Sequence, residues 1–336
     1  MNETKEKIYR SSVLCLIGLA LFSVGGVSGS YLTARAGQSA ERAAVTQNEV
    51  HKQTHAFTFT NPLLSCDTIE NISNQTVHHL RDQTKTTITN ALRSGSINYG
   101  AVYFRDLNNG PWFGINEKAD FTPGSLLKVP FMISLLKLAE SDPSFLRRQV
   151  SYQKGGSEIS QYFKPEEEMI SGQVYSLQDL IERMIRYSDN RATLLLGQQV
   201  SLKELQKIYD ELGITEPYND TYRMSVRTYA SFFRILFNAT YLSQDRSEEA
   251  LKLLSESTFS LGIHAGVPPE IMVAHKFGER SGEAGEDLQL HDCGIVYYPR
   301  YPYLLCVMTR GDNFSRLASV IHDISRIIYS SLKDTL

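Results

Sequence analysis

A serine and a lysine three positions apart are the residues of this sequence best suited to covalent chemistry. They lie in residues 121–128 (FTPGSLLK), where a Pro-Gly pair breaks the chain and an apolar periodic run follows. We therefore expect Ser125 at or near the first turn of a helix, with Lys128 one turn further on the same face. A serine hydroxyl becomes a nucleophile when a base removes its proton, and lysine can be that base where apolar neighbours and the helix dipole disfavour its ammonium form. The amides at the helix start would then stabilise an oxyanion.

The spacing alone is not specific. Ser-x-x-Lys also occurs at Ser134 and at Ser151. Ser134 lies further along the same helix, where a rotation of about 100° per residue turns it to the opposite face. Ser151 lies in a polar segment with no helix start. On this pattern alone, an ordinary serine at a helix N-terminus is the commoner explanation for Ser125.

Two later motifs change this assessment. Ser188-Asp189-Asn190 follows a helical pattern at 177–187, where a loop is expected, and residues 275–278 (HKFG) end an apolar run that predicts a strand. Each motif alone has an ordinary explanation, a polar helix terminus or a charged strand end. All three motifs in this order are specific. Here the sequence resembles the class A serine β-lactamases and, more distantly, the penicillin-binding proteins.

The resemblance covers about residue 74 to the C-terminus and implies roles for the matching residues. Ser125 resembles the acylated nucleophile, and Lys128 resembles its general base. Ser188 resembles the hydroxyl that passes a proton to the leaving nitrogen, and Asn190 resembles the side chain that binds the substrate's amide carbonyl. The implied reaction is attack on a strained or D-Ala amide, a tetrahedral oxyanion, an acyl-enzyme on Ser125 and its hydrolysis.

The strand motif implies the remaining parts of the substrate site. Lys276 resembles the strand lysine that polarises Ser188 and attracts the substrate carboxylate, and Gly278 belongs to the same substrate-binding strand. The oxyanion hole would be formed by the backbone N–H groups of Ser125 and Glu279.

Two positions depart from the family's pattern. Phe277 stands in place of a hydroxyl residue and cannot donate the hydrogen bond that helps to hold a carboxylate, so such a group should bind more weakly or the substrate lacks it. Glu216, in the short connection 213–223, is a candidate for the carboxylate that positions the hydrolytic water, but Asp220 stands where an asparagine is expected. The alternative for Glu216 is a solvated loop carboxylate. Without a deacylating base the acyl-enzyme would be long-lived.

The pattern around these motifs predicts an α+β fold. An amphipathic helix at 74–92 and a hairpin at 99–115 come first, and helical patterns dominate 126–254. Strand patterns return at 271–277, 288–298 and 304–310, and a helix closes the chain at 315–332. Such runs indicate a helical region plus an antiparallel β-sheet flanked by N- and C-terminal helices. The resemblance implies the same β-lactamase/transpeptidase-like fold, with the three motifs meeting at a cleft.

The N-terminal segment predicts export. Residues 13–32 are uncharged and long enough to cross a bilayer as a helix, and three basic residues precede them, which favours a cytoplasmic location for residues 1–12. A single-pass membrane anchor and a signal peptide cut after residues 34–36 (ARA) both remain open. Residues 33–61 would form a linker, and residues 62–336 the extracytoplasmic class A β-lactamase-like domain.

Composition excludes several other classes of protein. A hydrophobic fraction of 42% fits a globular chain, and a net charge of −3 without a basic stretch argues against nucleic-acid binding. Outside the apolar segment, Cys66, Cys293 and Cys306 allow at most one disulfide among them. The spacing of His, Asp and Glu suggests no metal site. We expect a monomer with no cofactor and no metal.

Three functions follow as hypotheses. We favour an exported serine hydrolase, held at the membrane by its N-terminal segment, that opens a β-lactam through acyl-Ser125. The first alternative is a DD-peptidase acting on a peptidoglycan-derived peptide, or another acyl hydrolase on the same scaffold. The second is a slowly deacylating β-lactam receptor or a non-catalytic module that binds wall fragments. Phe277 and the short connection 213–223 favour slow turnover over efficient degradation.

Overall fold

The computed structural model describes residues 57–62, 71–155, 161–214, 222–281 and 286–336. The chain divides into a unit of residues 1–58 and a unit of residues 59–336, and all the elements below belong to the second unit. The segment 13–32 and the two residues Cys66 and Glu216 lie outside the described residues. Within the described part of the chain, no helix has the length and apolar character needed to cross a membrane.

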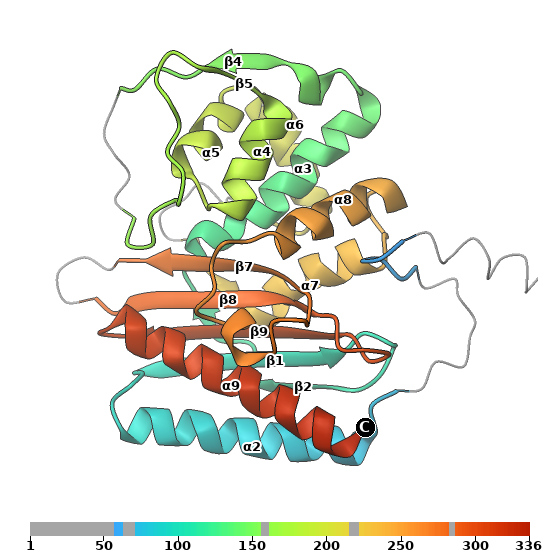
Figure 1. Ribbon diagram of the computed structural model, residues 1–336, viewed down its shortest axis with the longest axis vertical. Helices are drawn as coiled ribbons and strands as arrows, with labels where there is room; N and C mark the ends of the chain where they lie inside the picture. The colour runs from blue at the N-terminus through green and yellow to red at the C-terminus, as the bar shows by residue number, and fades with distance from the viewer. Residues whose placement is uncertain (1–56, 63–70, 156–160, 215–221, 282–285) are drawn as a thin grey trace, which may run out of the picture. The chain divides into compact units, whose positions relative to one another are not determined.

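The central sheet positions one of the three motifs. In the described residues it has the strand order β2-β1-β9-β8-β7, and every neighbouring pair is antiparallel. The strands are β1 (Tyr99–Asp106), β2 (Trp112–Ile115), β7 (Val273–Arg280), β8 (Leu288–Val296) and β9 (Tyr303–Gly311). The HKFG motif therefore lies on an edge strand, β7, next to the helical region (Figure 1).

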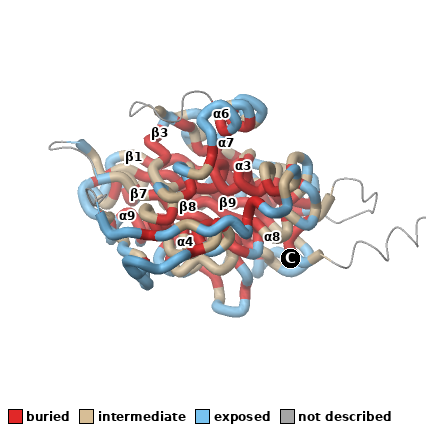
Figure 2. Tube along the Cα trace, turned by 90° about the horizontal axis from the view of Figure 1, so that it is seen from above, coloured by how far each residue is buried: buried red, intermediate tan, exposed pale blue. Residues whose placement is uncertain are grey.

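Helices cover both faces of this sheet. The helices α2 (Asn74–Arg93) and α9 (Phe314–Thr335) lie side by side on one face, and α7 (Val226–Phe237) and α8 (Gln244–Ser255) lie on the other (Figure 1). Strand β9 shows how the sequence supports two cores, because alternate side chains of a strand point to opposite faces. Leu304 and Met308 belong to the core under α7, whereas Leu305 and Val307 belong to the core under α2 and α9. Buried residues accordingly follow the strands and α7, and the outer surface of α6 is exposed (Figure 2).

In sequence, the helical region lies between strands β2 and β7 of the sheet. It contains a short 3₁₀ turn, η2 (Gly124–Leu127), which leads into α3. Its other elements, in chain order, are β3 (Asp120–Phe121), α3 (Lys128–Ser141), η3 (Phe145–Arg147), β4 (Gln149–Ser151), β5 (Val174–Ser176), α4 (Leu177–Arg186), α5 (Asn190–Gly197), α6 (Leu202–Glu211), β6 (Met224–Ser225) and, before β7, η4 (His264–Gly266).

Side-chain caps explain where most of these helices begin. A serine, aspartate or asparagine precedes the first helical residue and accepts a hydrogen bond from a backbone N–H of the first turn, which satisfies a donor without an intrahelical partner. These caps are Ser73, Ser176, Asp189, Ser201, Ser225, Ser243 and Asn313. The exception at the site is α3, whose N-cap Leu127 makes no such bond because η2 runs directly into it.

The α+β class expected from the sequence is confirmed, and so are the principal elements. The predicted helix at 74–92 is α2, and the predicted hairpin is the β1–β2 pair. The expected position of Ser125 at or near a helix start is also confirmed, because Ser125 lies in η2, which leads directly into α3. In a 3₁₀ turn the side chains at i and i+3 eclipse each other, so Ser125 and Lys128 share one side.

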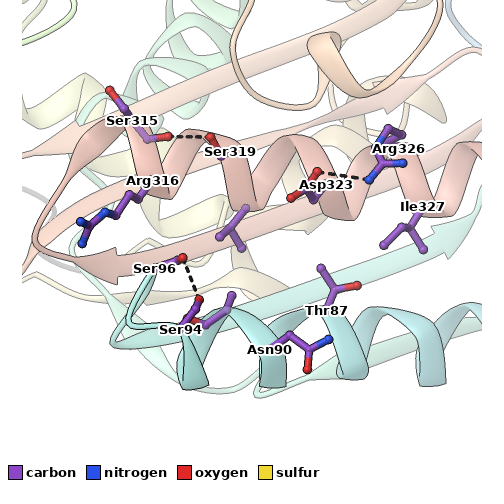
Figure 3. A pocket seen from close by; sticks show the side chains of 12 residues that line it. Thr87, Asn90, Ser94, Ser96, Ser315, Arg316, Ser319, Asp323, Arg326 and Ile327 are labelled. Carbon is purple, nitrogen blue, oxygen red and sulfur yellow. Dashed lines mark hydrogen bonds and ion pairs between the residues drawn. The ribbon is translucent and has the colours of Figure 1, made fainter.

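The face formed by α2 and α9 carries an open groove. Small and polar side chains line it, among them Ser94, Ser96 and Ser315, and Arg326 faces Asp323 across one turn of α9 (Figure 3).

Cys293 and Cys306 form a disulfide between directly opposed positions of β8 and β9. Both residues are fully buried in the core under α7. Of the pairings left open by the sequence, the structure thus contains 293–306.

We expect Cys293→Ala combined with Cys306→Ala to lower the free energy of unfolding by about 3 kcal/mol, because the crosslink restricts the unfolded chain. Denaturant unfolding of the wild type and the double variant measures the difference. Reductant should destabilise the wild type and leave the double variant unchanged. Equal sensitivity of the two proteins to reductant would contradict the crosslink.

Candidate functional site

The serine turn is held against the edge strand by two glycines. Gly124 has φ +53°, a conformation that L side chains rarely adopt, and a Cβ there would clash with the backbone carbonyl oxygen of Glu279. On the strand side, a Cβ at Gly278 would clash with the Pro123 carbonyl oxygen and with Leu126. The backbone of β7 at residues 278 and 279 therefore lies directly against the turn that carries Ser125, whose side chain is part-exposed.

Buried hydrogen bonds fix the turn from the opposite side. The hydroxyl of Tyr229 on α7 donates to the carbonyl oxygen of Leu126 at 3.0 Å. His291 on β8 places its Nε2 3.0 Å from the carbonyl oxygen of Thr122, and Gln289 accepts from the Thr122 N–H at 3.1 Å. Burial lowers the pKa of His291 to about 4, so the ring is neutral at pH 7 and donates through Nε2. The bonds from His291 and Gln289 hold the segment just before Ser125 to the sheet, and the bond from Tyr229 holds the residue after it to α7.

Lys128 points into the second motif. Its amine donates to the carbonyl oxygen of Ser188 at 2.7 Å, to the Ser188 hydroxyl at 3.1 Å and to the Oδ1 of Asn190 at 2.7 Å. Only 4% of the residue is exposed. Among the described residues these are the amine's hydrogen-bond acceptors, and the Ser125 hydroxyl is not one of them. Catalytic hydrogen bonds are often long or unformed without substrate.

Burial controls the charge of Lys128. Desolvation lowers its pKa to about 7, against the nearby carboxylates of Asp189 and Glu279, which raise it. An ordinary lysine is almost wholly protonated at pH 7, whereas one with this pKa is neutral about half of the time. Lys128 therefore meets the main requirement for a lysine that acts as a base, which is a neutral amine at physiological pH.

The turn between α4 and α5 presents Ser188 in a strained conformation. Its φ of +54° is unusual for a residue with a side chain. Asp189 holds this turn as the cap of α5, accepting from the N–H groups of Arg191 and Ala192. Gln161 adds a further bond, since its Nε2 donates to the carbonyl oxygen of Ser188 at 3.0 Å. Strain of this kind persists only where the surrounding structure enforces it, and it is concentrated at functional sites.

Lys276 and Phe277 of the strand motif are both buried. The amine of Lys276 donates to the carbonyl oxygen of Phe277 at 3.1 Å and lies 4.1 Å from the centre of its ring. The Phe277 ring stacks on Phe259 at 4.1 Å in the core under α2 and α9. Burial, followed by the nearby Lys128 cation, lowers the pKa of Lys276 well below its ordinary value, while Asp292 and Glu279 raise it. From the sequence, Phe277 indicated only that a hydroxyl is missing. In the structure its ring is part of a hydrophobic core.

Gly278→Ala is expected to disrupt the site directly. The added methyl group would lie 2.7 Å from the Leu126 side chain, 2.7 Å from the Pro123 carbonyl oxygen and 2.9 Å from the Leu126 nitrogen, so the serine turn must move. We expect a loss of about 1–3 kcal/mol in stability and, because small displacements impair catalysis strongly, about a 100-fold slower acylation of Ser125.

Thermal unfolding and the rate of labelling by a reporter β-lactam measure these two effects. Gly197→Ala in α5 is the matched control, because its methyl group would meet no atom within 4 Å. A Gly278→Ala protein that is labelled as fast as the Gly197→Ala control would contradict the close contact.

Glu279 contributes a side chain that sequence reasoning did not single out. Its Oε1 accepts from the Tyr162 N–H at 2.7 Å, and both of its oxygens accept from the Phe163 N–H, at 3.4 and 3.2 Å. Burial raises the pKa of Glu279, while these N–H groups, Lys128 and Lys276 act in the opposite direction. Gln161 was also missed. The only sequence signal for Glu279 is its position directly after the strand motif, and nothing local marks Gln161.

The structure brings the sequence-predicted residues together with one exception. The turn of Ser125, the amine of Lys128, the Ser188–Asn190 turn and the strand at Lys276 and Gly278 form one neighbourhood. The exception is Glu216, which lies outside the described residues. Within the described ranges, no group of three or more His, Cys, Asp and Glu side chains could hold a metal ion.

Comparison with known proteins agrees with this architecture. The structure of a point mutant of PBP-A, an acyl-enzyme complex with penicillin G, is 21% identical, with a TM-score of 0.62 over 77% of this chain and 97% of that chain. A class A beta-lactamase from Mycobacterium abscessus is 20% identical (TM-score 0.64, 76% and 99%). A beta-lactamase from Chitinophaga pinensis is 19% identical (TM-score 0.63, 76% and 99%). At these identities the likeness establishes the fold.

The family is assigned from the sequence. No curated protein matches it. The model of the beta-lactamase enzyme family matches residues 83–332, which span β1 to β9 and all three motifs. The resemblance drawn from those motifs is confirmed, and the chain belongs to the beta-lactamase enzyme family.

Proposed function

We propose that this protein is an exported active-site-serine hydrolase that opens a β-lactam through an acyl intermediate on Ser125. The observation that carries the proposal is the buried amine of Lys128, which bridges Ser188 and Asn190 beside the serine turn. A buried lysine with a pKa near 7 is unusual for a purely structural residue and is suited to proton transfer. The family match covers Ser125 and both later motifs, and this supports a shared role for them in one reaction.

Acylation uses the neutral form of Lys128. As the Ser125 oxygen bonds to the carbonyl carbon, its proton passes to the Lys128 amine, and the carbonyl electron pair moves onto oxygen. The backbone N–H groups of Ser125 and Glu279 would hold this oxyanion. The contact between Gly124 and the Glu279 carbonyl supports that role, because it places both backbone segments at the same point.

Ring opening returns the proton to the leaving nitrogen. The C–N bond breaks as the oxyanion collapses, and the Ser188 hydroxyl relays a proton from Lys128, to which it is hydrogen-bonded at 3.1 Å. Asn190 holds the lysine from the other side at 2.7 Å and would bind the substrate's amide carbonyl through its side-chain N–H₂. Lys276, in its protonated form, would lower the cost of proton transfer at Ser188. These steps need no cofactor.

Hydrolysis of the ester on Ser125 completes the cycle and requires an activated water. Glu216 is our candidate for the base. A second function is favoured by one observation at the strand motif, where Phe277 supplies a buried ring and no hydroxyl. If substrate is held loosely there and water is poorly activated, the protein would act as a penicillin-binding protein, either a slow DD-peptidase or a receptor that remains acylated.

We place this domain outside the cytoplasm as a monomer, anchored by residues 13–32 or released by cleavage after them. Two observations support export. The apolar segment and its basic flank have the pattern of an anchor or signal sequence. The Cys293–Cys306 disulfide is typical of proteins that fold in an oxidising compartment.

The test compares turnover with adduct formation. The soluble fragment from residue 59 is incubated with penicillin G, the ligand found in the similar PBP-A structure, and with a chromogenic cephalosporin. Ring opening in many equivalents per protein supports the hydrolase. A single lasting mass increment on Ser125 supports the receptor. Turnover of a D-Ala-D-Ala peptide instead supports the peptidase, and a folded protein that forms no adduct and turns nothing over rejects all three.

A further inference from the structure

The side chain of Glu279 brings a carboxyl group into a site that otherwise holds two lysine amines. Lys128 and Lys276 are both buried there, and the Glu279 carboxylate is close enough to raise the pKa of each. Glu279 is part-exposed, whereas Lys276 has no exposed surface and directs its amine to the carbonyl oxygen and ring of Phe277. An approaching substrate therefore meets the Glu279 carboxyl group more readily than the Lys276 amine.

The segment 161–163 fixes the carboxylate in this position. Its backbone N–H groups at Tyr162 and Phe163 engage both Glu279 oxygens. The segment is itself secured at each end. Gln161 donates to the Ser188 carbonyl oxygen at 3.0 Å, and the Phe163 ring packs edge-on against Phe277 at 5.7 Å. The segment thus bridges the Ser188 turn and β7, and the carboxylate has little freedom to swing away.

This arrangement affects any anionic substrate in two ways. The N–H groups of Tyr162 and Phe163 are already bound to the Glu279 carboxylate and are not available to a substrate. A second carboxylate placed beside Glu279 would also experience like-charge repulsion in a part-buried site, where screening by water is weak. Introduced repulsion is a common means of excluding one class of ligand.

We propose that Glu279 is a specificity-determining residue that selects acyl donors without a carboxylate next to the scissile bond, so that the preferred substrates of Ser125 are neutral or cationic amides and esters. The inference rests on the proposed acylation of Ser125 and adds the substrate class. The proposal also explains why residue 277 is a phenylalanine. A site that binds no substrate carboxylate does not need a hydroxyl at that position.

The experiment uses two probes that differ in one charge, penicillin G and its methyl ester. Acylation of Ser125 by each probe is followed by intact-protein mass spectrometry. In the wild type the ester should react faster. Glu279→Gln keeps a side-chain oxygen for the Tyr162 N–H and removes the charge. We expect it to speed acylation by penicillin G by about tenfold or more, because placing like charges together is strongly unfavourable, and to change the rate with the ester little.

Glu167→Gln is the matched control, because Glu167 is an exposed carboxylate paired with Arg183 at the surface. It should leave the ratio of the two rates unchanged. Glu279→Ala serves as a second variant should the glutamine protein fold poorly. Because it also removes the charge, we expect it to raise the ratio of the acylation rate with penicillin G to the rate with the ester, compared with the wild type.

Two results would overturn the inference alone. One is a wild type that prefers the free acid with a ratio that Glu279→Gln does not alter. The other is an equal gain for both probes in the Glu279 variants, which would assign the effect to opening of the 161–163 bridge. Failure of both probes to label any folded variant would instead reject the proposed acylation, and this inference with it.

Discussion

Ser125→Ala is expected to abolish covalent attachment of a β-lactam and to reduce any turnover by at least about 10³-fold, since no other group replaces a nucleophile that forms the acyl bond. The fold should tolerate the change, because Ser125 is part-exposed and caps no helix. Intact-protein mass spectrometry with a β-lactam measures the adduct, and thermal unfolding confirms that the variant is folded.

The chain provides a matched control for this experiment. Ser151 belongs to another Ser-x-x-Lys triplet but lies exposed on β4. Ser151→Ala should be acylated as fast as the wild type. An adduct that persists in Ser125→Ala, or that peptide mapping places on another residue, would remove Ser125 as the nucleophile.

Substitution of Lys128 is expected to have the second largest effect. Lys128→Met should slow acylation by about 10²–10⁴-fold, the usual contribution of a general base. In the wild type the acylation rate should rise with pH through a midpoint near 7, because the lysine must be neutral to accept the Ser125 proton and its pKa is lowered to about 7 by burial. Below that pH the amine is protonated, and the rate should fall about tenfold per unit.

A second substitution separates the base from the cation. Lys128→Arg keeps a positive charge but cannot become neutral at accessible pH. We expect it to be as slow as Lys128→Met and to lose the rise near pH 7. Rapid acylation by Lys128→Arg, or a wild-type rate that is flat between about pH 5 and 9, would contradict a base with the lowered pKa.

The sequence predicted those parts of the site that depend on local pattern. Ser125 could be selected as a candidate because a Pro-Gly break, a serine and an apolar run occur together, and Ser188 because its triplet ends a helical pattern. The hairpin and the helices followed from periodicity, and their caps agree with it. In each case the information lies within about one turn or one strand of the residue concerned.

The remaining features depend on contacts between distant segments. Phe277 looked like a missing hydroxyl, and only its stacking on Phe259 shows that the ring completes a core. The carboxylate of Glu279 is held in place by N–H groups at residues 162 and 163, more than a hundred positions earlier in the sequence. The left-handed backbone at Ser188 likewise requires the surrounding turn. Such properties arise from packing, and a single sequence does not display them.

The pairing of β1 with β9 also has a consequence for biosynthesis. Tyr99 faces Arg310 and Asp106 faces Tyr303 in the completed sheet, and α2 packs beside α9. The strand made first among the described ones must therefore wait, unpaired on that side, until nearly the whole polypeptide has left the ribosome. Long-range pairing of this kind slows folding. The sheet therefore closes only when β9, the last strand of the described chain, is available to pair with β1.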